Sequence, residues 1–306
     1  MFVVGCPRSG TSLLATMVEL HPGVALLREA HFLDQAMLKV AGVSGQRRQQ
    51  SRLWAAYEHD QHFVKQGFSP EDVCALGREL TPRTFYAAMM RMHAHRSEAA
   101  IMGEKTPSNF RYISTMLEWF PNARIVFAVR DARSVVASIL ARWQTSLVDA
   151  VKAWNAAAAA AQRWSSDGRV MLVPYERMTA EPEAMVAQVY GHLELDFDPA
   201  WLAKRLVEDV RLGYGSINAG SAITQGQVGL WRERLTASQV RQVEWAARRG
   251  MAQLGYLPEN HLAGSWAFRA ARAGSELERI VRAGQDPQAA LGRLRSRRSA
   301  ERSARN

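Results

Sequence analysis

The sequence contains few cysteines and no long hydrophobic run. Only Cys6 and Cys74 occur among its 306 residues, which excludes a disulfide framework and leaves at most one buried pair. Neither cysteine lies in a pattern typical of a metal site. No uncharged apolar stretch reaches the roughly 18 residues that a transmembrane helix requires, and no basic segment precedes a hydrophobic core at the N-terminus. We therefore expect a cytoplasmic protein without a transmembrane segment and without a metal.

The sequence also lacks a surface pattern of interleaved basic and aromatic residues, so we expect no nucleic-acid partner. The net charge is +10, but 10 arginines against 4 acidic residues between Ala263 and Asn306 contribute +6 and leave +4 for residues 1–262. We expect residues 263–306 to form an arginine-rich extension that is partly helical, near Ser275–Ala283, or disordered. A weak contact of this extension with an anionic surface is the alternative.

Short buried strands alternate with helical patterns along the rest of the chain. The strands are expected at Phe2–Gly5, Ala100–Gly103, Arg124–Val129 and Arg169–Val173, and the clearest helices at Thr11–Leu20, Pro182–Leu193 and Ser238–Leu254. This alternation predicts an α/β fold, a P-loop-like parallel sheet flanked by helices on both faces. We expect one domain over residues 1–262, with a helical insertion at about 30–96. The long polar segment Arg211–Val228 is expected to close over a ligand.

The first strand leads into a glycine-rich loop, GCPRSGTS, at Gly5–Ser12. The spacing is that of a phosphate-binding loop, but Thr11 stands where a nucleotide kinase carries its lysine. Backbone amides at a helix N-terminus suit a tetrahedral oxyanion. The residues expected to bind that anion without metal are Arg8, Ser9, Gly10, Thr11 and Ser12.

A second anion site is expected in the stretch RIVFAVRDARSVVAS. It places Arg130 at the carboxyl end of a strand and Ser138 two turns into the following helix. Ligands of open α/β sheets bind at this edge. Two anion sites without a kinase lysine indicate a nucleotide that carries phosphates on two ribose positions.

With these two stretches the sequence resembles the sulfotransferases that use 3′-phosphoadenosine 5′-phosphosulfate (PAPS). CPRSGTSLL is similar to their 5′-phosphosulfate loop, and VRDARSVVAS to their 3′-phosphate segment. GQVGLWRERLT resembles their closing motif, which implies nucleotide contacts for Gly226 and Arg232. The sequence departs from the family where Thr224 and Gln225 replace a basic pair. The resemblance spans about Phe2–Tyr256 and implies PAPS as co-substrate.

Two further stretches resemble the heparan-type glycan branch of that family, and we expect a bacterial member of it. In REAHFLDQ the resemblance implies that Glu29 is the general base and that His31 and Asp34 support the acceptor. In GEKTPSNF it implies that Lys105 assists at the transferred group. Glu104 is a candidate acceptor-binding residue, and His31 and Glu104 are alternative bases. Ser108 and Asn109 are expected to cap the next helix.

The resemblance implies in-line transfer of a sulfuryl group to an acceptor hydroxyl, with Arg8 at the leaving group. We expect the acceptor to be a carbohydrate, a glycolipid or another secondary metabolite. Two alternatives remain: a kinase-like phosphotransferase and a catalytically silent nucleotide-binding protein. The tryptophans Trp143, Trp154 and Trp164 are expected to pack in the core, with an acceptor cleft as the alternative.

Overall fold

The computed structural model describes residues 1–34, 81–202 and 227–259, which form two compact units. The first unit combines Met1–Arg130 with Ala159–Gln227, and the second combines Asp131–Ala158 with Val228–Asn306. The single domain expected over residues 1–262 stays a prediction. Most of the predicted insertion, nearly all of Arg211–Val228, and the arginine-rich extension lie outside the described residues, as does Cys74.

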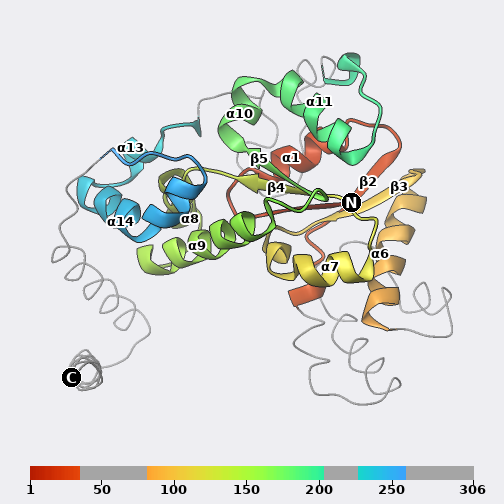
Figure 1. The fold of residues 1–306 in the computed structure, drawn as a ribbon, viewed down its shortest axis with the longest axis horizontal. Helices are drawn as coiled ribbons and strands as arrows, with labels where there is room; N and C mark the ends of the chain where they lie inside the picture. The colour runs from red at the N-terminus through yellow and green to blue at the C-terminus, as the bar shows by residue number, and fades with distance from the viewer. Residues whose placement is uncertain (35–80, 203–226, 260–306) are drawn as a thin grey trace. The chain divides into compact units, whose positions relative to one another are not determined.

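The first unit contains a five-stranded sheet with strand order β2-β3-β1-β4-β5 (Figure 1). The strands are β1 (Phe2–Gly5), β2 (Val24–Arg28), β3 (Ile101–Lys105), β4 (Ile125–Val129) and β5 (Val170–Pro174). Every pair of neighbouring strands is parallel. The α/β fold expected from the alternation of strands and helices is confirmed.

One face of this sheet is covered by α1 (Thr11–Val18), α10 (Tyr175–Ala180) and α11 (Pro182–Leu193). Apolar side chains of these helices form one buried cluster with Val3, Leu26 and Val126 of the strands. The hydroxyl of Tyr190 donates to the carbonyl of Met17 at 3.0 Å, which ties α11 to the end of α1. Helix α1 is therefore held by packing along its length, so the loop that precedes it is fixed as well.

The opposite face is covered by α6 (Pro82–Arg96), the 3₁₀ segment η1 (Pro107–Tyr112) and α7 (Ile113–Trp119). Aromatic rings dominate here, because Phe32 stacks on Tyr86 with ring centroids 4.9 Å apart and Phe2 lies 6.0 Å from the same ring. Thr81 caps α6 through a reciprocal bond pattern with Thr84. The helical character expected near the end of the insertion is thus present in α6.

The second unit contains α8 (Ala132–Arg142), the first part of α9 (Leu147–Trp164), α13 (Trp231–Arg234) and α14 (Ala237–Gln253). The buried guanidinium of Arg133 bonds Asp131 at 2.6 Å and Glu244 at 2.8 Å. Trp154 is buried, as expected for a core residue, whereas Trp143 is 45% exposed.

The described ranges contain no helix long and apolar enough to cross a membrane. Within the same ranges, no cluster of three or more His, Cys, Asp or Glu side chains is arranged to hold a metal ion.

Candidate active site

The candidate site lies at the edge of the sheet where the five parallel strands end. The phosphate loop, Gly5–Ser12, includes the end of β1, Glu29 follows β2, Lys105 ends β3 and Arg130 follows β4. These positions come from segments far apart in the sequence. The parallel topology brings them to one edge, which is where ligands of open α/β sheets bind.

The phosphate loop has the backbone geometry of an anion cradle. Gly10 adopts a left-handed conformation, with φ 89°, directly before α1. A Cβ at this position would lie 2.4 Å from Cδ2 of Tyr175, so a side chain here would be strained as well as obstructed. Arg8 also has a positive φ, 73°. The Ser9 hydroxyl is buried and has no hydrogen-bond partner among the described residues, as expected of a donor meant for a ligand.

Cys6 lies inside the same loop but is unsuited to nucleophilic chemistry. Its thiol is free and buried, and burial raises its pKa to about 12. Because the thiolate is the reactive form, this cysteine is a packing residue.

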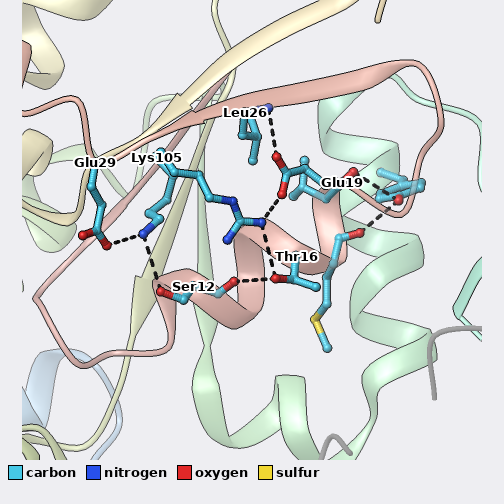
Figure 2. A network of polar contacts seen from close by, with 10 residues as sticks. Ser12, Thr16, Glu19, Leu26, Glu29 and Lys105 are labelled. Carbon is cyan, nitrogen blue, oxygen red and sulfur yellow. Dashed lines mark hydrogen bonds and ion pairs between the residues drawn. The ribbon is translucent and has the colours of Figure 1, made fainter. Parts of the chain in front are cut away.

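A polar line joins Glu29, Lys105 and Ser12, as Figure 2 shows. The Lys105 ammonium forms an ion pair with Glu29 and donates to the Ser12 hydroxyl at 3.5 Å. The lysine side chain is 1% exposed, whereas the glutamate is 37% exposed. Burial lowers the pKa of Lys105, and the neighbouring Glu29 opposes that shift. The arrangement places a carboxylate that solvent can reach against an enclosed cation at the phosphate loop.

Arg28 forms a second polar connection, and its partners Thr16 and Glu19 are labelled in Figure 2. Its guanidinium pairs with Glu19 and donates to the Thr16 hydroxyl at 3.4 Å. Glu19 also accepts from the amide of Leu26 at 3.0 Å, and Thr16 donates to the carbonyl of Ser12 at 3.0 Å. Arg28 therefore links β2 to α1, so the strand that leads to Glu29 is fixed against the phosphate loop.

The turn after β2 is strained. Glu29 and His31 have φ values of 52° and 50°, a left-handed region that costs residues other than glycine about 1–3 kcal/mol each. The amide of Glu29 donates to the carbonyl of Lys105 at 2.7 Å, and the amide of His31 donates to the Thr106 hydroxyl at 3.3 Å. Such strain concentrates at functional sites, where the surroundings over-determine the conformation.

His31 and Asp34 form a pair near Glu29. Nδ1 of His31 lies 3.7 Å from a carboxylate oxygen of Asp34, which also accepts from the Ser108 hydroxyl at 2.5 Å. The hydrogen bond to Asp34 raises the pKa of His31, and the same bond lowers the pKa of Asp34. The predicted helix cap at Ser108 is wrong, because its hydroxyl bonds Asp34 and η1 has no side-chain cap.

Glu104 lies on the other face of β3 and is completely buried. Its carboxyl accepts from Thr106 and, at 2.8 Å, from Asn109, so the predicted cap at Asn109 is also wrong. Burial raises the pKa of Glu104 to about 7. A group with no accessible surface cannot reach an acceptor without movement, so this placement speaks against the predicted acceptor contact and against Glu104 as a base.

Arg130 is held at the end of β4. Its guanidinium donates to the carbonyls of Arg8 at 3.2 Å and Gln227 at 2.8 Å, and it lies 3.9 Å above the ring of Tyr175. Tyr175 was not predicted as a site residue, although it follows β5 directly and so lies at the same edge of the sheet.

The other predicted nucleotide-binding residues lie outside the described part of the first unit. Ser138 is a half-buried residue of α8 in the second unit. Arg232, also in the second unit, pairs with Glu259 and lies 4.4 Å from the ring of Trp231. Gly226 lies outside the described residues. The roles expected for these three residues stay predictions.

Comparisons with known proteins identify the class. A family model described as the sulfotransferase family matches residues 1–199, about two thirds of the chain. The chain therefore belongs to the sulfotransferase family. It is similar to a protein-tyrosine sulfotransferase of Drosophila melanogaster, with 24% identity over 212 residues that cover 66% of this chain and 39% of that protein. The chain thus spans well under two thirds of this curated relative.

Two solved structures share the fold. The sulfotransferase domain of the olefin synthase from Synechococcus PCC 7002 is 22% identical with a TM-score of 0.59, and covers 84% of this chain and 94% of its own. The sulfotransferase domain from the curacin biosynthetic pathway is 18% identical with a TM-score of 0.57, and covers 84% and 97%. The family expected from the sequence is confirmed, whereas its heparan-type branch stays a prediction.

Proposed function

We propose that this protein transfers the sulfuryl group of PAPS to the hydroxyl of an acceptor. The observation that carries the proposal is the line from Glu29 through Lys105 to Ser12, because it sets an accessible carboxylate and an enclosed cation against the phosphate loop. The membership in the sulfotransferase family supports the same reaction.

The phosphate loop suits the 5′-phosphosulfate of the donor. Its amides and the buried Ser9 hydroxyl fit a tetrahedral oxyanion, and Gly10, against which the Tyr175 ring packs, allows the left-handed turn before α1. The proposed loop contacts are Arg8, Ser9, Gly10, Thr11 and Ser12. Arg130 is proposed for the 3′-phosphate, since a phosphate oxygen can replace the backbone carbonyls that its guanidinium contacts. Family resemblance adds Ser138, Gly226 and Arg232.

In the transfer step, the acceptor oxygen forms a bond to sulfur while the bond between sulfur and the bridging oxygen of the donor breaks. Glu29 accepts the acceptor proton, and positioned bases of this kind contribute about 10²–10⁴-fold. Lys105 and Arg8 donate to the oxygens on which negative charge develops, so the bis-phosphorylated nucleotide leaves as an anion. His31, held by Asp34, orients the acceptor and is the alternative base.

The acceptor is proposed to be a hydroxyl of a carbohydrate, a glycolipid or another secondary metabolite. The name of the Drosophila relative refers to protein tyrosine, so a tyrosine-containing peptide is included as an acceptor in the test. A kinase-like reaction is disfavoured, because Thr11 occupies the place of the loop lysine that a triphosphate requires.

Calorimetry distinguishes the two nucleotide classes. We expect 3′-phosphoadenosine 5′-phosphate to bind without a metal and at least ten-fold more tightly than ATP with Mg²⁺. If the protein binds ATP with Mg²⁺ and does not bind 3′-phosphoadenosine 5′-phosphate, the proposal is overturned in favour of a phosphotransferase.

A transfer assay tests the reaction itself. PAPS with a radiolabelled sulfuryl group is incubated with oligosaccharides, glycolipids, phenols and a tyrosine-containing peptide. For an acceptor that is labelled, we expect Glu29→Gln to retain nucleotide binding and to lose at least 100-fold in kcat. Glu183→Gln, at an exposed position on α11, is the matched control. If Glu29→Gln turns over like the control, Glu29 is not the base.

A further inference from the structure

Two backbone hydrogen bonds hold the turn that carries Glu29 and His31, in addition to the side-chain pairs with Lys105 and Asp34, and one of the two bonds has a side chain as its acceptor. The amide of Glu29 bonds the main-chain carbonyl of Lys105, which any residue type can supply. The amide of His31 bonds the hydroxyl of Thr106 at 3.3 Å. Both turn residues have left-handed backbone conformations, which persist only where other contacts hold them. The bond to Thr106 is therefore a contact through which one side chain can stabilise the turn.

The Thr106 hydroxyl has one hydrogen to donate, and it donates it to Glu104. Donation in that direction leaves the lone pairs of the oxygen for the amide of His31. Without an acceptor at Glu104 the hydroxyl is free to rotate, so Glu104 determines whether Thr106 accepts from the turn. The side chains of both residues are completely buried, so water does not compete for these bonds.

Glu104 is itself fixed by neighbours from two other elements. The side-chain amide of Asn109, in η1, donates to the second carboxyl oxygen of Glu104 at 2.8 Å and to the Tyr86 hydroxyl at 3.2 Å. Tyr86, in α6, also hydrogen-bonds Glu104, and its ring stacks on Phe32, the residue directly after His31. The same buried group therefore contacts the turn through Thr106 and, by way of Tyr86, through Phe32.

We propose that Glu104 is a positioning residue that acts through the Thr106 hydroxyl to hold the turn bearing Glu29 and His31. The inference rests on the proposed function for its catalytic consequence. The hydrogen bonds that run from Glu104 through Thr106 to the turn, called the clamp below, are a property of the folded chain. The inference assigns a role to Glu104 other than contact with the acceptor or proton transfer.

The primary test replaces Thr106 and measures hydrogen exchange of the turn. Thr106→Val keeps the size and removes the hydroxyl, and we expect the amide of His31 to exchange at least ten-fold faster. Thr106→Ser restores the hydroxyl and is expected to stay within about two-fold of the unmodified protein. The matched control is Thr179→Val, a buried threonine of α10 whose hydroxyl bonds carbonyls of its own helix. This control is expected to leave the exchange at His31 unchanged.

Glu104→Gln provides the second test, because an amide oxygen still accepts from Thr106. We expect the exchange of the His31 amide to stay within about three-fold of the unmodified protein. Glu104→Leu, which has no acceptor, is expected to match Thr106→Val. The proposal is overturned if Thr106→Val leaves His31 as protected as Thr179→Val does, or if Glu104→Gln loosens the turn as much as Thr106→Val.

Turnover distinguishes a role in positioning the turn from a purely structural role, because only the positioning role predicts a loss of kcat without a loss of nucleotide affinity. With an acceptor from the transfer assay, we expect Thr106→Val to lower kcat at least ten-fold while the Kd for 3′-phosphoadenosine 5′-phosphate changes less than two-fold. Thr179→Val is expected to change neither quantity. Equal losses of kcat and nucleotide affinity would contradict a role confined to the turn. If the unmodified protein labels no acceptor, the proposed function fails, whereas the exchange measurements still decide whether the clamp exists.

Discussion

Glu104 and Lys105 are adjacent on β3, yet they lie in two different regions of the first unit. Lys105 belongs to the region shown in Figure 2, where its partner Glu29 is 37% exposed. Glu104 belongs to a closed region in which Thr106 and Asn109 are also buried. Successive residues of a strand point to opposite faces, so one step along the chain separates the two regions.

The difference shows that burial of an ionisable residue does not by itself identify a reacting group. Both side chains are almost completely buried, and burial shifts both pKa values, that of Lys105 downwards and that of Glu104 upwards. Among the described hydrogen-bond and ion-pair partners, that of Lys105, Glu29, is one that solvent, and therefore a substrate, can reach, whereas Thr106, Asn109 and Tyr86 around Glu104 are buried. Accessibility of the partner is the property that distinguishes the proposed reaction centre from its support.

The largest expected effect comes from Lys105→Met. This substitution removes the cation from the region of Glu29, Lys105 and Ser12, which is called the open region below. Methionine fills a similar volume, so we expect the free energy of unfolding to change by less than about 1.5 kcal/mol. We expect kcat to fall by about 10²–10³, as for the loss of one donor to developing negative charge. The measurement is turnover of the labelled donor beside thermal unfolding. A variant that unfolds readily but turns over normally would reverse the roles assigned to the two regions.

The closed region is expected to make stability depend on pH through Glu104. Burial raises its pKa to about 7, whereas Thr106, Tyr86, Lys105 and His31 oppose the shift. The folded state therefore holds a proton that the unfolded state releases near pH 4.5. The contribution of Glu104 to the free energy of unfolding is fully present below pH 4.5. It is lost as the pH rises to about 7, and the loss amounts to at most about 3 kcal/mol.

Urea unfolding at pH 5 and pH 8 measures this contribution. Glu104→Gln cannot ionise, so its stability is expected to fall less over this range than that of the unmodified protein. An identical fall in the two proteins would show that Glu104 titrates normally and that the region is not closed.

A smaller effect is expected from the second polar connection of the open region. Glu19→Gln leaves the guanidinium of Arg28, whose side chain is 11% exposed, without its charged partner. We expect a loss of about 1–3 kcal/mol in the free energy of unfolding. The matched control is Glu194→Gln, which breaks the more exposed pair with Arg124 and is expected to cost less than about 1 kcal/mol. Equal losses in the two variants would mean that Arg28 contributes no more than a surface pair.

Much of the sheet was predictable from the sequence, because its strands are short apolar runs. β1 was predicted as Phe2–Gly5 and is found with those bounds, and the helix Pro182–Leu193 likewise. Residue types alone could also place Arg8 and Arg130 at the carboxyl ends of strands. These features are local, so a window of a few residues contains their cause.

The supports of the site were not predictable, because they depend on residues far apart in the chain. Ser108 was expected to cap a helix, but Asp34, 74 residues away, takes its hydroxyl. Glutamate rarely adopts a left-handed conformation, and histidine adopts it in only a minority of cases, so the residue types did not mark the conformation of Glu29 and His31. Thr106 carries no signal of its own until the fold brings it to His31.

The smallest expected effect concerns the pair beside the open region. Asp34→Asn removes the charge that helps to raise the pKa of His31 and leaves only a neutral acceptor, so this pKa is expected to fall. A raised pKa of a histidine stabilises the fold below the unfolded value of 6.5, and that contribution is lost as pH rises through the folded value. The Asp34 carboxylate, whose pKa is lowered, contributes above pH 3.8. The loss of unfolding free energy in Asp34→Asn is therefore expected to be largest between pH 3.8 and pH 6.5 and smaller at pH 8.

Nuclear magnetic resonance titration, with the signal assigned by its loss in His31→Gln, measures the pKa of His31 directly. If it stays unchanged in Asp34→Asn, the pair does not form in solution, and Asp34 serves only to hold Ser108.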